Sequence, residues 1–142
     1  MPKYKYGFKG KEGEKYARAQ QYNIDASYKD LVEVCRNVKN MLTDNATKYL
    51  EEVIEMKRPV RYYRYAKRLG SRRELGGKKG RYPKKAANIV LNTLKNAIAN
   101  ADQIGILNPK IIHISANKQT TYPRLQPKGG RRGRRTDRKS VV

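Results

Sequence analysis

The chain has 142 residues, with 34 lysines and arginines against 12 aspartates and glutamates, so its formal net charge is +22 at pH 7. That length suits one domain, and so large a positive charge opposes compaction unless a polyanion such as nucleic acid neutralises it. No apolar run approaches the ~20 residues that span a bilayer, and the basic segments lack the apolar stripe of a membrane-surface helix, so no membrane partner is expected.

The chain begins with a basic segment. Residues 1–15 are rich in Lys, Gly and Tyr and show no sustained period, which predicts an arm that orders only on its partner. From Tyr16 to Ile24 a weak alternation predicts a short strand. We expect a globular α+β domain over residues 16–117.

Two amphipathic helices are expected next. Ser27 followed by Asp30 is typical of a capped helix start, and apolar residues then recur every three or four positions over residues 28–40. Thr43 or Asp44 can cap a second helix, which Pro59 ends. Seven of the twelve acidic residues lie between residues 25 and 55, so this pair of helices is expected to face away from phosphate.

The single cysteine, Cys35, lies on the apolar face of the first of these helices. This position favours a buried small apolar residue over a reactive thiol. One cysteine excludes an intrachain disulfide and fits a reducing compartment. With His113 as the only histidine, no zinc site of the usual four ligands is expected.

A basic loop follows at about residues 57–82. Residues 57–85 hold thirteen Lys or Arg and one acid, Glu74, with tyrosines interleaved. This composition predicts a loop that contacts RNA. We expect a short helix at residues 62–69 and an irregular path around Gly76 and Gly77.

A long helix and a strand complete the predicted domain. Pro83 suits the first position of a helix that runs to about Gln103, and Gly105 suits its end. Residues 111–117 form a β-rich run. His113 lies in this run without a nearby acid or nucleophile, so a structural or solvent-side role is favoured over catalysis.

Residues 118–142 contain few apolar residues and cannot build a core of their own. Pro123 and Pro127 favour an extended backbone, and Gly129 with Gly130 permits a turn. We expect an extended basic hairpin tip there, followed by the start of a return strand.

The sequence lacks the usual motifs of catalysis and metal binding. The sequence has no phosphate-cradling loop ending in Lys and Ser or Thr, no nucleophile elbow and no clustered carboxylates for magnesium. No catalytic residue, metal site or cofactor is predicted, and the chain is not expected to be an enzyme. Scattered Arg, flexible arms and Tyr favour folded RNA over DNA. The predicted RNA-binding residues are Lys57, Arg58, Arg61, Arg64, Lys67, Arg68, Arg72, Arg73, Lys78, Lys79, Arg81, Lys84, Lys85, Lys118, Arg124, Lys128, Arg131, Arg132, Arg134 and Arg135.

Several stretches together carry a family resemblance. They are Ala46-Thr47-Lys48-Tyr49-Leu50, Gly80-Arg81-Tyr82-Pro83-Lys84-Lys85-Ala86-Ala87, Leu94-Lys95-Asn96-Ala97, Asn100-Ala101-Asp102, His113-Ile114 and Asn117-Lys118. Over roughly residues 16–133 the chain resembles the universal large-subunit ribosomal protein twenty-two family. It is closer to the archaeal and eukaryotic branch, in which eukaryotes number the protein seventeen.

The resemblance implies an α+β fold with three helices packed on a small antiparallel sheet and a long basic β-hairpin extension. It implies a cytoplasmic, structural constituent of the large ribosomal subunit that binds the large-subunit ribosomal RNA and bridges its domains during assembly. Its implied partners are that RNA, neighbouring large-subunit proteins and the nascent polypeptide. The hairpin would line the nascent-peptide exit tunnel, with a tip formed by Gln126, Pro127, Lys128, Gly129, Gly130, Arg131, Arg132, Gly133 and Arg134.

Two departures and two alternatives stay open. The basic stretch at residues 61–79 matches the family's motifs poorly, so its RNA contacts are predicted from charge alone. The family's chain returns from the tip along an alternating strand, whereas here the sequence leaves only the beginning of one. Either the sequence is shortened or the second arm is brief. Composition also permits a free RNA chaperone or regulatory RNA-binding module. An RNA-modifying or RNA-cleaving enzyme would need His113 or a carboxylate at its reaction centre.

Overall fold

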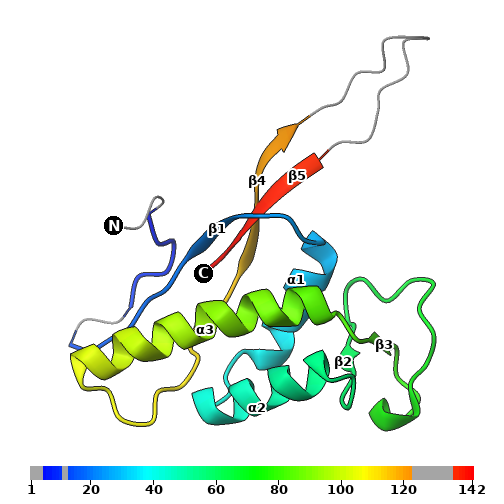
Figure 1. Cartoon of the computed structure of the whole chain (residues 1–142), viewed down its shortest axis with the longest axis horizontal. Coiled ribbons are helices and arrows are strands. Elements are labelled where there is room, and N and C mark those ends of the chain that lie inside the picture. The colour runs from blue at the N-terminus through cyan, green and yellow to red at the C-terminus, as the bar shows by residue number, and fades with distance from the viewer. Residues whose placement is uncertain (1–4, 11–12, 123–135) are drawn as a thin grey trace.

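The computed structural model describes residues 5–10, 13–122 and 136–142. Within these ranges the chain forms three α-helices, one short 3-10 helix and two small antiparallel sheets (Figure 1). The predicted α+β class is therefore confirmed. No helix in the described part of the chain is long and apolar enough to cross a membrane.

The helices enclose the core. The long helix α3 (Lys84–Ile104) packs on α1 (Tyr28–Val38) and α2 (Thr43–Ile54), as Figure 1 shows. Residues of the apolar stripes that predicted these helices form the buried faces: Leu31, Val34, Cys35, Val38, Ala46, Leu50, Val53, Ala86 and Val90. Cys35 is buried as predicted.

The helix ends follow some of the sequence signals and not others. Pro83 is the N-cap residue of α3 and not its first residue, and α2 ends at Ile54, before Pro59. Ser27 Oγ accepts the Asp30 N–H, and Gly105 ends α3 with a left-handed φ of 76°. The predicted side-chain cap of α2 is wrong, because Leu42 is the N-cap residue and makes no cap hydrogen bond. The Thr43 N–H donates to the Pro109 carbonyl at 3.1 Å, so a distant segment satisfies one of the first N–H groups, which have no partner within the helix.

The larger sheet has the order β1-β5-β4, with β1 at Gln21–Ile24, β4 at Ala116–Tyr122 and β5 at Thr136–Val141. The return strand, expected only to begin, is thus the central strand, and its Val141 is fully buried opposite Gln21 and Ala116. Figure 1 shows β4 and β5 projecting away from the helices. The predicted tip, residues 126–134, lies outside the described residues.

The β-rich run at residues 111–117 becomes a strand only from Ala116. Ile111 is buried and pairs with the turn between α1 and α2, accepting the Asn40 N–H and donating to the Met41 carbonyl, each at 2.9 Å. The apolar pattern therefore indicated the burial of Ile111 correctly, but it did not indicate the segment with which Ile111 pairs.

The second sheet pairs β2 (Val60–Arg61) with β3 (Gly80–Arg81), and the basic loop connects them. The helix predicted at residues 62–69 is wrong; the chain there turns without regular structure, and the 3-10 helix η1 lies at Arg73–Leu75. The division into arm, domain and hairpin stays a prediction.

Candidate RNA interface

The basic loop is attached to α1 through a buried carboxylate. Glu33 lies on α1 and has no exposed surface. Its Oε2 accepts the Tyr63 N–H at 3.0 Å, and its Oε1 accepts the N–H groups of Arg64 and Tyr65 at 2.8 and 2.9 Å. Bonding to three successive backbone amides fixes the path of the chain at residues 63–65, where no helix forms.

Two further side chains of α1 hold the start of the loop. The Asn37 Nδ2 donates to the Arg61 carbonyl at 2.9 Å, and the Tyr62 hydroxyl donates to Asp30 Oδ1 at 2.6 Å. Burial and this hydrogen bond raise the pKa of Tyr62. The polar face of α1 therefore fixes the loop backbone, and the acids of α1 serve the basic loop instead of lying apart from it.

The far part of the loop is held by its own backbone. The Arg72 N–H donates to the Lys78 carbonyl at 2.9 Å, and Ser71 and Lys79 form a bridge. The Arg72 side chain turns inward, where its Nε donates to the Gly80 carbonyl at 3.1 Å. Arg72 was predicted to bind RNA, but the structure gives it this internal bond.

Tyrosines hold several cationic side chains in place. The Tyr63 ring contacts the guanidinium groups of Arg36 and Arg61, whose carbons lie 4.6 and 4.3 Å from the ring centre. The Tyr65 ring contacts Arg64 and Lys29 at 5.6 and 5.7 Å. An arginine packed on an aromatic face keeps its N–H edge available to phosphate and loses less side-chain entropy on binding.

Arg36 and Lys29 belong to α1 and were not predicted as RNA-binding residues. Their signal was present in the sequence, because they are seven residues apart and so share one face of the helix. The acidity of the surrounding segment hid that signal. Their contacts with Tyr63 and Tyr65 place both side chains beside the basic loop.

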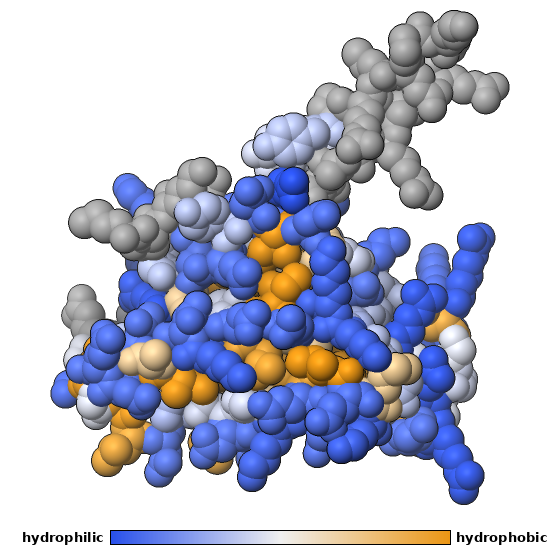
Figure 2. Space-filling model, viewed as in Figure 1, coloured by the Kyte–Doolittle hydropathy of each residue, from blue (hydrophilic) through white to orange (hydrophobic). Residues whose placement is uncertain are grey.

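Most of the predicted cations are exposed. Among those in the described ranges, all but Arg61 and Arg72 are exposed, and Figure 2 shows hydrophilic side chains projecting where Figure 1 places the loop. Lys57 and Arg58 differ because they pair with Glu55 and Glu52, at 2.5 and 3.5 Å. Six predicted residues lie outside the described ranges: Arg124, Lys128, Arg131, Arg132, Arg134 and Arg135.

Lys118 lies apart from the loop in sequence, at the base of the hairpin. Its ammonium group is 5.2 Å from the centre of the Tyr28 ring at the start of α1. Strand β4 and helix α1 therefore bring Lys118 to the same helix whose side chains hold the loop. Whether the predicted cations contact RNA stays a prediction.

Comparison with known proteins decides the family. The model of the family described as "Ribosomal protein L22p/L17e" matches residues 19–142. The chain belongs to this family. It is 45% identical to the large ribosomal subunit protein uL22 of Methanocaldococcus jannaschii, covering 81% of this chain and 76% of the relative. It is 35% identical to uL22 of Staphylothermus marinus, covering 100% and 97% of the two chains. It is 38% identical to uL22 of Archaeoglobus fulgidus, and the match covers 90% of this chain and 84% of the relative.

Membership of the L22 family confirms the predicted resemblance, and it also confirms that the chain is a structural ribosomal protein and not an enzyme. His113 and Cys35, which were considered as reactive residues, lie in surroundings that suit structural roles. The His113 ring stacks on Phe8, with ring centres 5.0 Å apart. Burial raises the pKa of the Cys35 thiol to about 12. No group of potential metal ligands occurs among the described residues.

Proposed function

We propose that the chain, as a structural constituent of the large ribosomal subunit, binds the large-subunit ribosomal RNA and bridges its domains during assembly. The observation that carries this proposal is the family match over residues 19–142, which includes both the basic loop and the hairpin strands. A net charge of +22 supports RNA as the main partner. Neighbouring large-subunit proteins would complete its surroundings in the cytoplasmic ribosome.

The basic loop is the first proposed RNA contact. Its backbone is fixed by Glu33, and its arginines pack on tyrosines, so the cations are positioned before RNA arrives. Preorganised groups lose less entropy on binding than mobile ones. If the chain contacts about 6 to 10 phosphates, its affinity for RNA should fall by roughly 10³- to 10⁵-fold when salt is raised from about 50 to 200 mM.

The hairpin is the second proposed contact, and we assign its tip, residues 126–134, to the wall of the nascent-peptide tunnel. Support comes from the antiparallel pairing of β4 with β5, which projects from the helices. Replacing residues 129–135 with a short Gly-Ser turn should leave assembly largely intact but alter the response to tunnel-binding drugs or arrest peptides. A control that changes Arg131 and Arg132 to lysine keeps the charge. An unchanged response in assembled particles would contradict the tip assignment.

Sedimentation of a cell lysate through a sucrose gradient at moderate salt tests the whole proposal. Stoichiometric co-migration with the large subunit is the expected result. A peak at the top of the gradient would instead favour a free RNA chaperone or regulatory RNA-binding module.

A further inference from the structure

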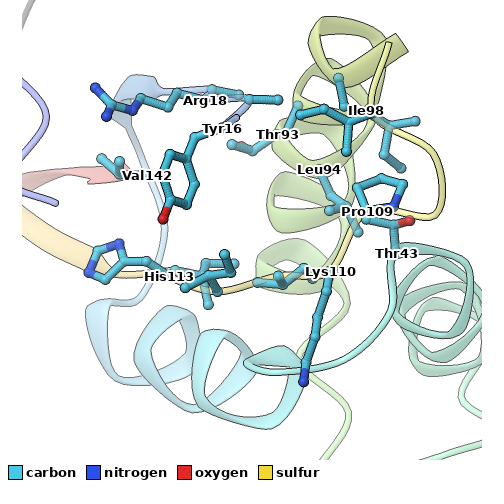
Figure 3. A pocket seen from close by; sticks show the side chains of 18 of the residues that line it. Tyr16, Arg18, Thr43, Thr93, Leu94, Ile98, Pro109, Lys110, His113 and Val142 are labelled. Carbon is cyan, nitrogen blue, oxygen red and sulfur yellow. The ribbon is translucent and has the colours of Figure 1, made fainter. Parts of the chain in front are cut away.

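A cavity of about 300 Å³ lies at the opposite end of α3 from the basic loop. Its walls come from α3, from residues 106–114 and from the N-terminal arm. Figure 3 shows Tyr16 and His113 on one side of the cavity and Leu94 and Ile98 of α3 on the other. Nothing in the proposed RNA-binding function uses this cavity.

The cavity exists because small residues of α3 face it. Ala97 and Ala101, four residues apart on one face of the helix, leave space that larger side chains would fill. The arm closes part of the opening: Phe8 stacks on His113 and meets Tyr16 edge to face, with ring centres 6.0 Å apart. The Tyr16 hydroxyl donates to Glu14, which turns this tyrosine's polar end toward a partner.

The walls are apolar and the rim is cationic. Lys15, Arg18 and Lys110 line the opening with exposed side chains, and Figure 3 shows the head groups of Arg18 and Lys110 pointing outward. Among the described lining residues none is Asp or Glu. Two acids lie close in the chain to lining residues: Glu14, held by Tyr16, and Asp102, which follows Ala101 on α3. The excess of positive charge would attract carboxylates.

The surface next to the cavity is also apolar. Leu107, which follows α3, is 90% exposed, and Ile104 and Ile112 are 43% and 48% exposed. Exposed apolar side chains gathered beside a hollow are typical of surfaces that bind another protein. Because Ile112 also lines the cavity, the exposed residues and the hollow share one segment of chain.

We propose that this cavity docks a segment of another protein that inserts one large apolar side chain and carries acidic residues on both flanks. The apolar walls would bury the side chain, and Lys15, Arg18 and Lys110 would face the acids. A nucleobase suits the site less well, because its polar edges need hydrogen bonds. The lining hydroxyl of Thr93 already has two acceptors for its proton, Gln21 Oε1 and the Ile89 carbonyl, each at 3.0 Å.

The test uses the full-length chain and fluorescein-labelled peptides in which a central leucine or phenylalanine is flanked by aspartates and glutamates. Fluorescence anisotropy should detect binding. Ala97→Phe, which fills the cavity from α3, should weaken it about tenfold or more, since burying one such side chain is worth that much. The matched control is Asn96→Phe, an exposed neighbour on α3 that does not line the cavity and should bind as the parent does. Lys110→Glu should weaken binding without changing the fold.

Other peptides and readouts separate the possible occupants. A peptide with serine in place of its apolar residue, or lysines in place of its acids, should not bind. Binding that is equal in the parent and Ala97→Phe chains would overturn the proposal. So would loss of affinity for ribosomal RNA in Ala97→Phe, which would mean that RNA occupies the cavity, or a change in oligomeric state, which would mean that a second copy does. Peptide binding is measured without RNA, so this result is independent of the ribosomal function.

Discussion

Glu33 is the residue on which the shape of the basic loop depends most. A buried carboxylate is costly unless hydrogen bonds compensate it, and here three consecutive backbone N–H groups do so. These bonds fix the path of the loop backbone, and they replace the hydrogen bonds that water would make to the carboxylate.

Glu33→Ala should therefore destabilise the protein by about 3 kcal/mol, because it removes charge-assisted hydrogen bonds and leaves a cavity. Denaturant titration would measure the loss. Hydrogen exchange would locate it, since the amides of residues 63–65 should lose protection while those of α3 keep theirs. Glu51→Ala, an exposed acid on α2, is the control and should change stability little. Unchanged exchange at residues 63–65 would contradict the anchoring role.

Gly80 is a second residue fixed by its surroundings, in β3. A Cβ atom there would lie 2.7 Å from the Val60 carbonyl oxygen and 2.5 Å from the Leu75 Cδ1. We expect Gly80→Ala to destabilise the protein by about 1–3 kcal/mol, because the Val60 oxygen belongs to the backbone of the paired strand and cannot move freely. Gly70→Ala is the matched control in the same loop, since nothing lies within 4 Å of its added Cβ. Thermal denaturation of both variants would check the difference.

Cys35 gives a prediction about pH. Burial raises the pKa of its thiol from 9.0 to about 12. Below pH 9 the thiol is protonated in both the folded and unfolded chains, so its full contribution to stability is present. Between pH 9 and 12 the unfolded thiol ionises while the folded one does not, so stability falls as pH rises. The difference in denaturation midpoint between the parent and Cys35→Ala should shrink over this range. A constant difference would contradict burial of the thiol.

At the scale of elements, the spacing of apolar residues predicted those helices that bury one face in the core. The spacing of Leu31, Val34 and Val38 located α1, and Ala86, Val90 and Leu94 located α3, because one face of each helix had to enter the core. The helix at residues 62–69 was wrong for the converse reason. Its local sequence permits a helix, but bonds from Asn37 and Glu33 of α1, some thirty positions earlier in the chain, hold residues 61–65 in another path. Tertiary bonds of this kind leave no local pattern.

The basic loop supplies a prediction that separates free cations from paired ones. Arg64 is exposed and packs on Tyr65, whereas Lys57 pairs with Glu55 at 2.5 Å. Arg64→Gln should weaken binding to an archaeal large-subunit ribosomal RNA and reduce the slope of log affinity against log salt by about 1. Lys57→Gln removes the same charge but should change the slope less, because Glu55 already neutralises it. Filter binding across a salt series would measure both slopes, and equal changes would contradict the distinction.

At the scale of the whole molecule, the sequence predicted the protein family better than it predicted how distant segments pack together. The positive charge and the family motifs indicated a ribosomal protein, and the family match confirms that. The central place of β5 was not predictable, because its few apolar residues give little alternation and its second partner, β1, lies near the other end of the chain. The cavity was hidden for a similar reason, since its walls combine the arm, α3 and residues 106–114.

The fold separates two surfaces along α3. The basic loop joins the start of this helix at Lys84, and the cavity's lining on α3 runs from Thr93 to Ala101, about 14 to 25 Å away at 1.5 Å per residue. Charges that far apart are largely screened at physiological salt, where the Debye length is about 8 Å. Among the described residues, none that lines the cavity belongs to the basic loop, so the binding energies of the two surfaces should add.

We therefore expect the acidic-flanked peptide to bind with the same affinity, within about twofold, whether or not the chain is saturated with ribosomal RNA. The double variant Arg64→Gln with Ala97→Phe should lose RNA affinity as Arg64→Gln does and peptide affinity as Ala97→Phe does. Anisotropy titrations at about 150 mM salt, with and without RNA, would measure both. Competitive displacement of the peptide by RNA would mean that RNA extends over the cavity rim at Lys15, Arg18 and Lys110, and that the two ends of α3 serve one partner.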